Sequence, residues 1–294
     1  MTSPGAPLPL PSALVEAADR DGRTAWLATL PTVVARATRA WSLTVETPFR
    51  PGGQTAWVAP VRDRAGTDLV LKLAWTHPEA LHEADGLRAW AGNGAVRLYA
   101  AEDLAGTTAL LLERCRPGTP VTVRPERKQD EVVAELLLRL WSAPTTHGRF
   151  RPLQAMCDAW AAEAEAHLAA EPHLLDPGLA REGLALFRAL PTSAEREVLL
   201  ATDLHAGNIL AAQRQPWLVI DPKPYVGDPA YDVLQHLLNC EERLQQDPAG
   251  LAARMANLLE MEPLRLRRWL FARCVQEAPG WPPLADIARR IPID

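Results

Sequence analysis

The chain has 294 residues, 48% of them hydrophobic, and a formal net charge of −5. This length supports a large core in one domain or two lobes, and the acidic balance argues against a nucleic-acid partner, because phosphate binding needs a concentrated basic surface. No apolar run approaches the roughly 20 residues of a membrane-spanning helix, and the N-terminus lacks the features of a signal peptide, so we expect a cytoplasmic protein with no membrane partner.

The first part of the chain predicts a small lobe rich in strands. In chain order we expect a helical segment at 12–39, interrupted at Pro31, and three strands at 41–46, 55–61 and 68–74. A helix that starts at Pro78 follows, and then two further short strands at 95–98 and 108–112. The Pro117-Gly118 pair marks a boundary near its end.

Beyond that pair the apolar spacing predicts mainly helices, over residues 126–142, 153–171, 178–189, 230–245, 249–260, 263–276 and 283–290. A loop and strand insert interrupts them at about 198–221. The expected fold is therefore α+β, with two lobes. An antiparallel-sheet lobe spans 1–114, including a helical extension at 12–40, and a large helical lobe spans 115–294.

The four cysteines are widely spaced, with no Cys-x-x-Cys pair, at Cys115, Cys157, Cys240 and Cys274. This spacing argues against both a disulfide framework and a structural zinc site. We expect buried free thiols.

The most informative segment carries three oxygen-bearing side chains in a fixed order. Asp203 and Asn208 lie five positions apart, and Asp221 follows the apolar run 217–220. Phosphoryl transfer from ATP needs a group that accepts the hydroxyl proton and oxygen ligands for the metal on the phosphates. The Asp-x-x-x-x-Asn spacing is that of a kinase catalytic loop. We therefore expect Asp203 to be the base and Asn208 and Asp221 to be Mg²⁺ ligands.

Lysine is rare in this chain: only three of its 31 basic residues are lysines. Lys72 lies within an apolar strand, where a charge needs a partner, and Glu83 on the following helix is positioned to supply one. The alternative is a lysine at a strand edge with its head in solvent. The turn at Gly52-Gly53 is either a phosphate-covering hairpin or only a turn.

Lys223 lies two residues after Asp221. It either adds positive charge near the transferred group or balances the acidic site, and the sequence does not decide between the two. His205, within the loop, is expected to be structural. Asp228 and Asp232 precede or begin a helix, where capping or loop anchoring is the favoured role.

The motifs at 203–210 and 217–232, with weaker matches at 71–73, 111–114 and 272–277, resemble the bacterial aminoglycoside phosphotransferases, in particular the streptomycin 6-kinase and hydroxyurea phosphotransferase branch. The resemblance implies a protein-kinase-like fold and transfer of phosphate from ATP, with Mg²⁺, to a hydroxyl of a small molecule. It also implies that Lys72 binds phosphates and that Glu83 orients it. The segment 111–115, including Glu113 and Cys115, would be the hinge that holds adenine. One departure from the family is Ala201-Thr202, where His-Gly is common before the base.

The same resemblance suggests an aminoglycoside such as streptomycin as acceptor, and a role in antibiotic resistance. Acidic residues of the helical lobe would suit such a cation, with Asp232 and Glu277 as candidate contacts. Two alternatives stay open. One is a kinase of hydroxyurea or another hydroxylated metabolite, and the other is a catalytically idle kinase-like module with a regulatory role.

Overall fold

The computed structural model describes residues 8–77, 80–104, 106–145 and 148–294. Its contacts divide the chain into two compact units. The first runs to Gly118 and includes Ala212–Arg214, and the second comprises Thr119–Ala211 and Gln215–Asp294. The assignment of nucleotide binding to residues 1–114 and of acceptor binding to residues 115–294 stays a prediction.

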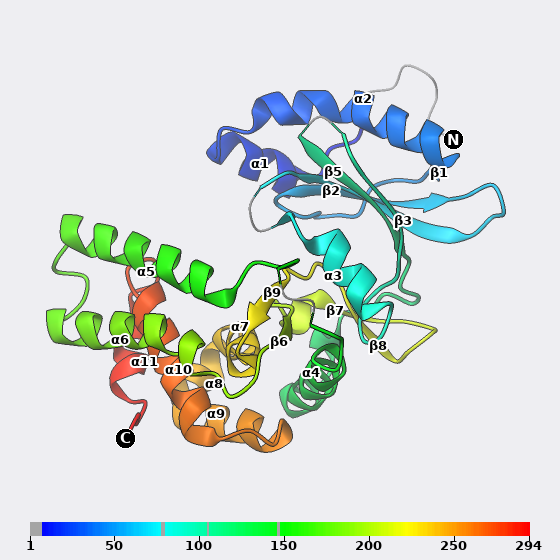
Figure 1. Ribbon diagram of the computed structural model, residues 1–294. Helices are drawn as coiled ribbons and strands as arrows, with labels where there is room; N and C mark the ends of the chain where they lie inside the picture. The colour runs from blue at the N-terminus through cyan, green and yellow to red at the C-terminus, as the bar shows by residue number, and fades with distance from the viewer. Residues whose placement is uncertain (1–7, 78–79, 105, 146–147) are drawn as a thin grey trace. The chain divides into compact units, whose positions relative to one another are not determined.

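The first unit is built on a five-stranded antiparallel sheet (Figure 1). Its strand order is β1-β2-β3-β5-β4, with β1 at Thr44–Val45, β2 at Ala56–Arg62, β3 at Asp68–Trp75, β4 at Leu98–Asp103 and β5 at Thr107–Glu113. The central strand β3 pairs with β2 on one side and with β5 on the other, so that Lys72 lies between Val58 and Leu110. The register therefore places Lys72 in the middle of the sheet.

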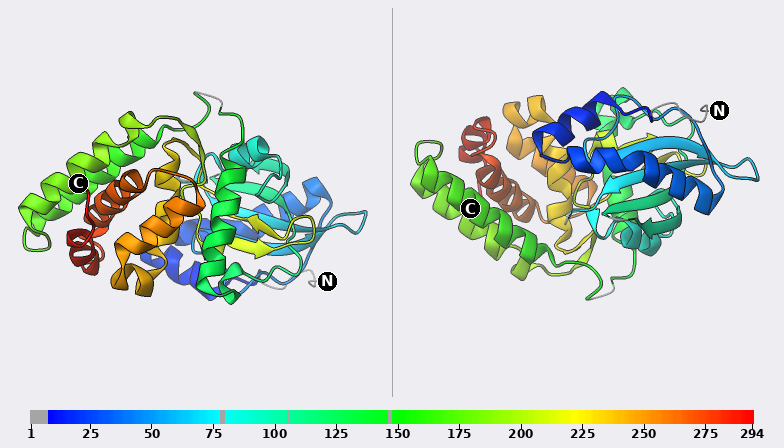
Figure 2. Two further views of the ribbon diagram at one scale, coloured as in Figure 1. Left: turned by 90° about the horizontal axis from the view of Figure 1, so that it is seen from below. Right: turned by 90° about the horizontal axis from the view of Figure 1, so that it is seen from above.

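Two helices, α1 (Ser12–Arg20) and α2 (Thr24–Trp41), cover one face of this sheet (Figure 2). The prediction of an interruption at Pro31 was wrong. Gly22, at φ 67°, makes the break instead, and Pro31 lies inside α2. Proline removes one helical hydrogen bond. The apolar face of α2, including Leu30 and Val34, is buried in the core and offsets this loss.

Three boundaries in the first unit differ from the predicted ones. Because α2 continues through Trp41, the strand expected at 41–46 is reduced to β1. The strand expected at 95–98 begins only at Leu98, because the buried Ala95 and Val96 lie in the preceding segment. The helix expected from Pro78 is α3, which spans Glu83–Trp90, and Pro78 itself lies outside the described residues.

The second unit contains eight α-helices among the described residues: α4 (Glu126–Leu140), α5 (Leu153–Ala170), α6 (Pro177–Ala189), α7 (Leu234–Leu238), α8 (Glu241–Gln246), α9 (Pro248–Leu258), α10 (Pro263–Glu277) and α11 (Pro283–Arg289). Buried helix α10 packs against α5, α6, α7, α9 and α11. Trp269 of α10 meets Phe187 and Tyr231 edge to face, with ring centroids 6.0 and 5.1 Å away. These contacts form the centre of the helical core.

The single helix expected at 230–245 is instead three pieces. A 3₁₀ turn at Pro229–Val233 leads into α7, and α8 starts after Cys240. Asp228 caps the first piece by accepting from the N–H of Ala230 at 3.0 Å, and Asn239 ends α7 by donating to the carbonyl of Gln235 at 2.8 Å. Local side-chain bonds of this kind compete with a continuous helix.

The expected loop and strand insert forms two short antiparallel pairs. Strand β6 (Val198–Leu200) pairs with β9 (Tyr225–Gly227), and β7 (Ile209–Ala211) pairs with β8 (Trp217–Val219). Among the described residues, no helix is both long and apolar enough to cross a bilayer.

Candidate active site

Lys72 and Glu83 form the ion pair that the sequence predicted. The ammonium Nζ lies 2.6 Å from Oε2 and 2.7 Å from Oε1 of Glu83, and both side chains are buried. Strand β3 supplies the lysine and the first turn of α3 supplies the glutamate. A buried ammonium without a carboxylate partner is costly, so the pair holds Lys72 in one place. The alternative of a lysine head in solvent is excluded by this geometry.

The turn at Gly52-Gly53 has a structural reason for its first glycine. Gly52 has φ 87°, and a Cβ there would lie 2.5 Å from the Cβ of Pro11. Both features require glycine, whether or not a phosphate approaches. A phosphate-covering role for Gly52 and Gly53 therefore stays a prediction.

The predicted hinge contains an anchored glutamate and a neutral thiol. Glu113 accepts from Arg214 Nη2 at 2.8 Å and from the N–H of Arg97 at 3.0 Å. Burial opposes the charge, but these bonds hold the pKa of Glu113 below its usual range. Burial raises the pKa of Cys115 to about 12. The Glu113 side chain thus fixes the segment, and adenine binding by its backbone stays a prediction.

The loop that carries the predicted base begins where β6 ends. Asn208 Nδ2 donates to the main-chain oxygen of Asp203 at 3.0 Å, and its own N–H donates to the carbonyl of His205 at 2.9 Å. His205 Nδ1 in turn accepts from the N–H of Gly207 at 3.1 Å, which is the structural role expected for it. Because the hydrogen bond to Asp203 uses only the Nδ2 of Asn208, the side-chain oxygen Oδ1 is available as a metal ligand.

The β7–β8 hairpin brings Asp221 next to this loop. The N–H of Ile220 donates to the carbonyl of Asn208 at 2.9 Å, immediately beyond the paired strands. Asp221 follows with φ 54° and is exposed. A non-glycine residue at positive φ is strained, and such residues are common at functional sites. The hairpin therefore brings the main chain of Asp221 close to that of Asn208, and an amide oxygen and a carboxylate are ligand types that suit Mg²⁺.

Asp232 does not fit the substrate contact predicted for it. Its side chain is fully buried, and its carboxylate accepts from the N–H groups of Ala201 at 3.0 Å and Thr202 at 2.6 Å and from Trp141 Nε1 at 2.9 Å. We assign Asp232 instead to positioning the chain just before Asp203. This is the loop anchoring that the sequence also favoured. Trp141 was not identified from the sequence, because a lone tryptophan gives no signal of this role.

Glu277, the other predicted substrate contact, lies at the C-terminal end of α10 with its side chain 37% exposed. One carboxylate oxygen is 2.5 Å from Arg273 Nη1, and the guanidinium of Arg273 stacks on Trp160 at 4.6 Å from the ring centroid. An acceptor cation would therefore meet a carboxylate that is already partly neutralised. The substrate role of Glu277 stays a prediction.

Lys223 contacts the predicted base directly. Its Nζ lies 3.0 Å from Asp203 Oδ2, with Asp203 20% and Lys223 34% exposed. Main-chain bonds reinforce the contact, because the N–H of Lys223 donates to the carbonyl of Ala201 at 2.8 Å. The second unit thus carries Asp203 and Asn208 on one loop, and Asp221 and Lys223 directly after the β7–β8 hairpin.

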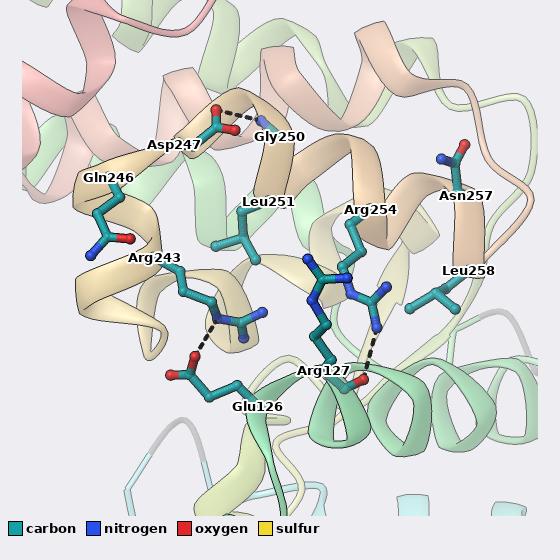
Figure 3. Close-up of a pocket in the computed structure, with 10 residues that line it drawn as sticks. All are labelled: Glu126, Arg127, Arg243, Gln246, Asp247, Gly250, Leu251, Arg254, Asn257 and Leu258. Carbon is teal, nitrogen blue, oxygen red and sulfur yellow. Dashed lines mark hydrogen bonds and ion pairs between the residues drawn. The ribbon is translucent and has the colours of Figure 1, made fainter.

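A separate cavity of about 590 Å³ lies between α4, α8 and α9 (Figure 3). Beside it the buried Asp130 accepts from His236 at 2.9 Å, from Arg243 at 2.8 Å and from Arg254 at 2.7 Å. Asp130, His236 and Cys240 have ligand atoms within 4.8 Å of one another. However, two guanidinium groups already occupy the carboxylate, so a metal cation there would meet like charge. We interpret the cluster as an ion network that ties four helices together.

Comparison with known proteins places these features in a family. The profile of the aminoglycoside/hydroxyurea antibiotic resistance kinases matches residues 41–282. The chain belongs to this family. It is 34% identical over 283 residues to a streptomycin 6-kinase of Streptomyces griseus, with 91% of this chain and 89% of that protein covered. It is also 36% identical over 284 residues to a hydroxyurea phosphotransferase of Kitasatospora aureofaciens, with 92% and 80% covered.

Solved structures agree on the fold. A thermostable mutant of the aminoglycoside phosphotransferase APH(4)-Ia, in complex with ADP and hygromycin B, matches with a TM-score of 0.58 and 16% identity, over 87% of this chain and 97% of that one. This member of the aminoglycoside/hydroxyurea kinase family therefore has the protein-kinase-like fold and is a small-molecule phosphotransferase that acts on hydroxyl groups. The idle-module alternative is set aside.

Proposed function

We propose that this kinase transfers the γ-phosphate of ATP, with Mg²⁺, to a hydroxyl of streptomycin or a closely similar aminoglycoside. The observation that carries the proposal is the order and proximity of Asp203, Asn208 and Asp221 in a chain that is 34% identical to a streptomycin 6-kinase. Residues of these three types, so ordered, supply a proton acceptor and two oxygen ligands for a metal on the phosphates.

Asp203 takes the proton of the acceptor hydroxyl as the new bond to phosphorus forms. A carboxylate on a tightly bonded loop can hold that hydroxyl in line with the γ-phosphate, and positioning supplies much of the rate. The bond from Asn208 Nδ2 to the main-chain oxygen of Asp203 and the bonds that the Asp232 carboxylate accepts from the N–H groups just before Asp203 support this role, because they hold the main chain on both sides of that carboxylate.

Asn208 and Asp221 would hold Mg²⁺, which would neutralise charge on the β- and γ-phosphates of the bound nucleotide. In the first unit, Lys72 would bind phosphate oxygens, with Glu83 keeping its ammonium in place. Gly52, Gly53 and the 113–115 segment are the other residues of the first unit that we propose for nucleotide binding. The ADP in a related structure supports this use of nucleotide.

A second candidate acceptor is hydroxyurea, because the chain is 36% identical to a hydroxyurea phosphotransferase. The two acceptors differ in charge, since streptomycin is a polycation and hydroxyurea is neutral. The partly exposed carboxylate of Glu277 favours the cation, although Arg273 shares that carboxylate.

The test is an acceptor panel with the purified full chain, ATP and Mg²⁺. ADP release would be followed together with ³¹P NMR of the product, for streptomycin, a second aminoglycoside and hydroxyurea. We expect a phosphorylated product with streptomycin and none when EDTA replaces Mg²⁺. Product with hydroxyurea alone would establish the alternative acceptor, and no transfer to any hydroxyl compound would contradict the proposed function.

A further inference from the structure

Lys223 reaches the catalytic loop from a different segment of the chain. It lies two residues beyond Asp221, after the β7–β8 hairpin, yet its ammonium is 3.0 Å from Asp203 Oδ2. The Lys223 side chain is 34% exposed and the Asp203 side chain is 20% exposed, so solvent reaches both members of the pair.

Thr202 fixes the position of Lys223. Its hydroxyl Oγ1 donates to the main-chain oxygen of Lys223 at 2.5 Å, and the N–H of Lys223 donates to Ala201 at 2.8 Å. Thr202 itself has φ 51°, a conformation that threonine rarely adopts, and its N–H donates to Asp232 Oδ1 at 2.6 Å. A β-branched residue at positive φ is costly. Glycine would relieve the strain but would lose the hydroxyl bond, so the structure offers a reason for threonine here.

The choice of lysine is also informative. The chain carries 31 basic residues, and only three are lysines. One is Lys72 in the buried pair, one is Lys128 in an exposed pair with Glu131, and the third is Lys223. A compact ammonium with three rotatable donors can contact a carboxylate and a phosphate oxygen together, whereas a planar guanidinium favours one bidentate partner. Such an ammonium suits a position between the base and the transferred group.

We propose that Lys223 is a catalytic residue that binds both Asp203 and the transferred phosphoryl group, and that Thr202 is the residue that positions it. This inference rests on the proposed function. In the step, the acceptor oxygen forms a bond to Pγ, the bond from Pγ to the β–γ bridging oxygen breaks, and ADP leaves with that electron pair. The acceptor proton passes to Asp203. The Lys223 ammonium stays protonated and stabilises the charge on the equatorial oxygens.

Two electrostatic effects of Lys223 oppose each other. Its ammonium binds the Asp203 carboxylate and so competes with the acceptor hydroxyl for it, but it also stabilises negative charge on the phosphoryl group. Phosphoryl transfer proceeds mainly through positioning and electrostatic stabilisation, with little demand on the base. The second effect should therefore dominate, and removal of the ammonium should slow the reaction.

The experiment compares Lys223→Met with Lys223→Arg in the full chain. Methionine keeps most of the unbranched side chain, ends one atom earlier and removes the charge. We expect kcat for phosphate transfer to fall roughly 10²-fold, with the KM for ATP changed less than about threefold, since the lost interaction forms mainly in the transition state. Lys223→Arg should recover at least about tenfold of that loss, because it restores the charge.

A second pair of variants tests the positioning residue without touching the charge. Thr202→Gly removes the hydroxyl and tolerates φ 51°, whereas Thr202→Ser keeps the hydroxyl. We expect Thr202→Gly to lower kcat about tenfold and Thr202→Ser to retain most of it. This pair keeps the inference testable if Lys223→Met does not fold.

Lys128→Met is the matched control, because it makes the same substitution at an exposed lysine of α4. It should leave kcat unchanged. The inference is overturned if Lys223→Met keeps kcat within about threefold of the wild type, or if kcat, KM and melting temperature all change together and arginine rescues none of them. Absence of transfer by the wild type would count against the proposed function instead.

Discussion

Asp232 is buried and makes hydrogen bonds to the segment before Asp203, so we assign it a positioning role and not a contact with substrate. Its carboxylate accepts from two consecutive N–H groups, those of Ala201 and Thr202, and from the indole of Trp141. Burial raises its pKa to about 6, while these three bonds act in the opposite direction. The acceptor oxygens of one buried residue thus fix the segment that leads into Asp203.

Substitution of this residue gives a clear prediction. Asp232→Asn keeps the size of the side chain but replaces one acceptor oxygen with an N–H₂ donor, which would face a main-chain donor. We expect a loss of about 1–3 kcal/mol in unfolding free energy and at least a tenfold loss in kcat, because a buried donor is left unpaired next to the loop. Urea unfolding and steady-state kinetics would measure both. Unchanged kcat in a folded variant would contradict the positioning role.

The helices of the second unit are held together by close packing and by one ion network. At Gly183 of α6, an added Cβ would lie 2.4 Å from the Cβ of Val275 on α10. Burial would lower the pKa of His236, but its bonds to Asp130 and Cys240 and the charges of these two groups together outweigh burial and raise the pKa to about 9. The same network holds the pKa of Asp130 far below its usual range, through bonds from His236 and two arginines.

The α6–α10 contact can be tested by adding one methyl group. Gly183→Ala should destabilise the protein by about 1–3 kcal/mol, because two packed helices must separate and this outweighs the higher helix propensity of alanine. Thermal unfolding monitored by circular dichroism would report the change. Gly250→Ala is not a suitable control, since a Cβ there would strike Asp247 at 2.0 Å. Gly280→Ala is suitable, since its nearest contact is 3.7 Å away. Equal stability of the two variants would contradict the close-packing account.

The ion network predicts a pH dependence with a definite sign. His236 has a folded pKa of about 9, above its unfolded value of 6.5. Its contribution to stability is therefore fully present below pH 6.5 and is lost as the pH rises through 9. Relative to His236→Gln, the wild type should lose about 3 kcal/mol of unfolding free energy between pH 6 and pH 10. Urea titrations at several pH values would measure this difference. Parallel pH profiles for the two proteins would contradict the prediction.

At the scale of the whole molecule, the helices and strands marked by regular apolar spacing were predicted well from the sequence. The sheet lobe, most helices of the second unit and the Lys72–Glu83 pair follow from apolar spacing and from a buried charge that needs a partner. The family resemblance gave the fold and the enzyme class, both confirmed by comparison.

Features decided by local bonding or tertiary contact were not predictable in the same way. Pro31 remained helical because the face around it is buried, and the 230–245 helix broke because Asp228 and Asn239 bond to the main chain. The sequence offered Asp232 both as a loop anchor and as a substrate contact, and only the three donors to its buried carboxylate decide for the anchor. Spacing alone cannot supply such partners.

The proposed reaction requires that Asp203 accept a proton from a small-molecule hydroxyl during transfer from ATP. The most direct measurement is single-turnover transfer of phosphate to streptomycin by the wild type and by Asp203→Asn, with circular dichroism to verify that both are folded. We predict transfer by the wild type and a loss of about 10³-fold in the variant, because general base catalysis and orientation of the hydroxyl are lost together. A folded Asp203→Asn protein that transfers phosphate at the wild-type rate would contradict the account.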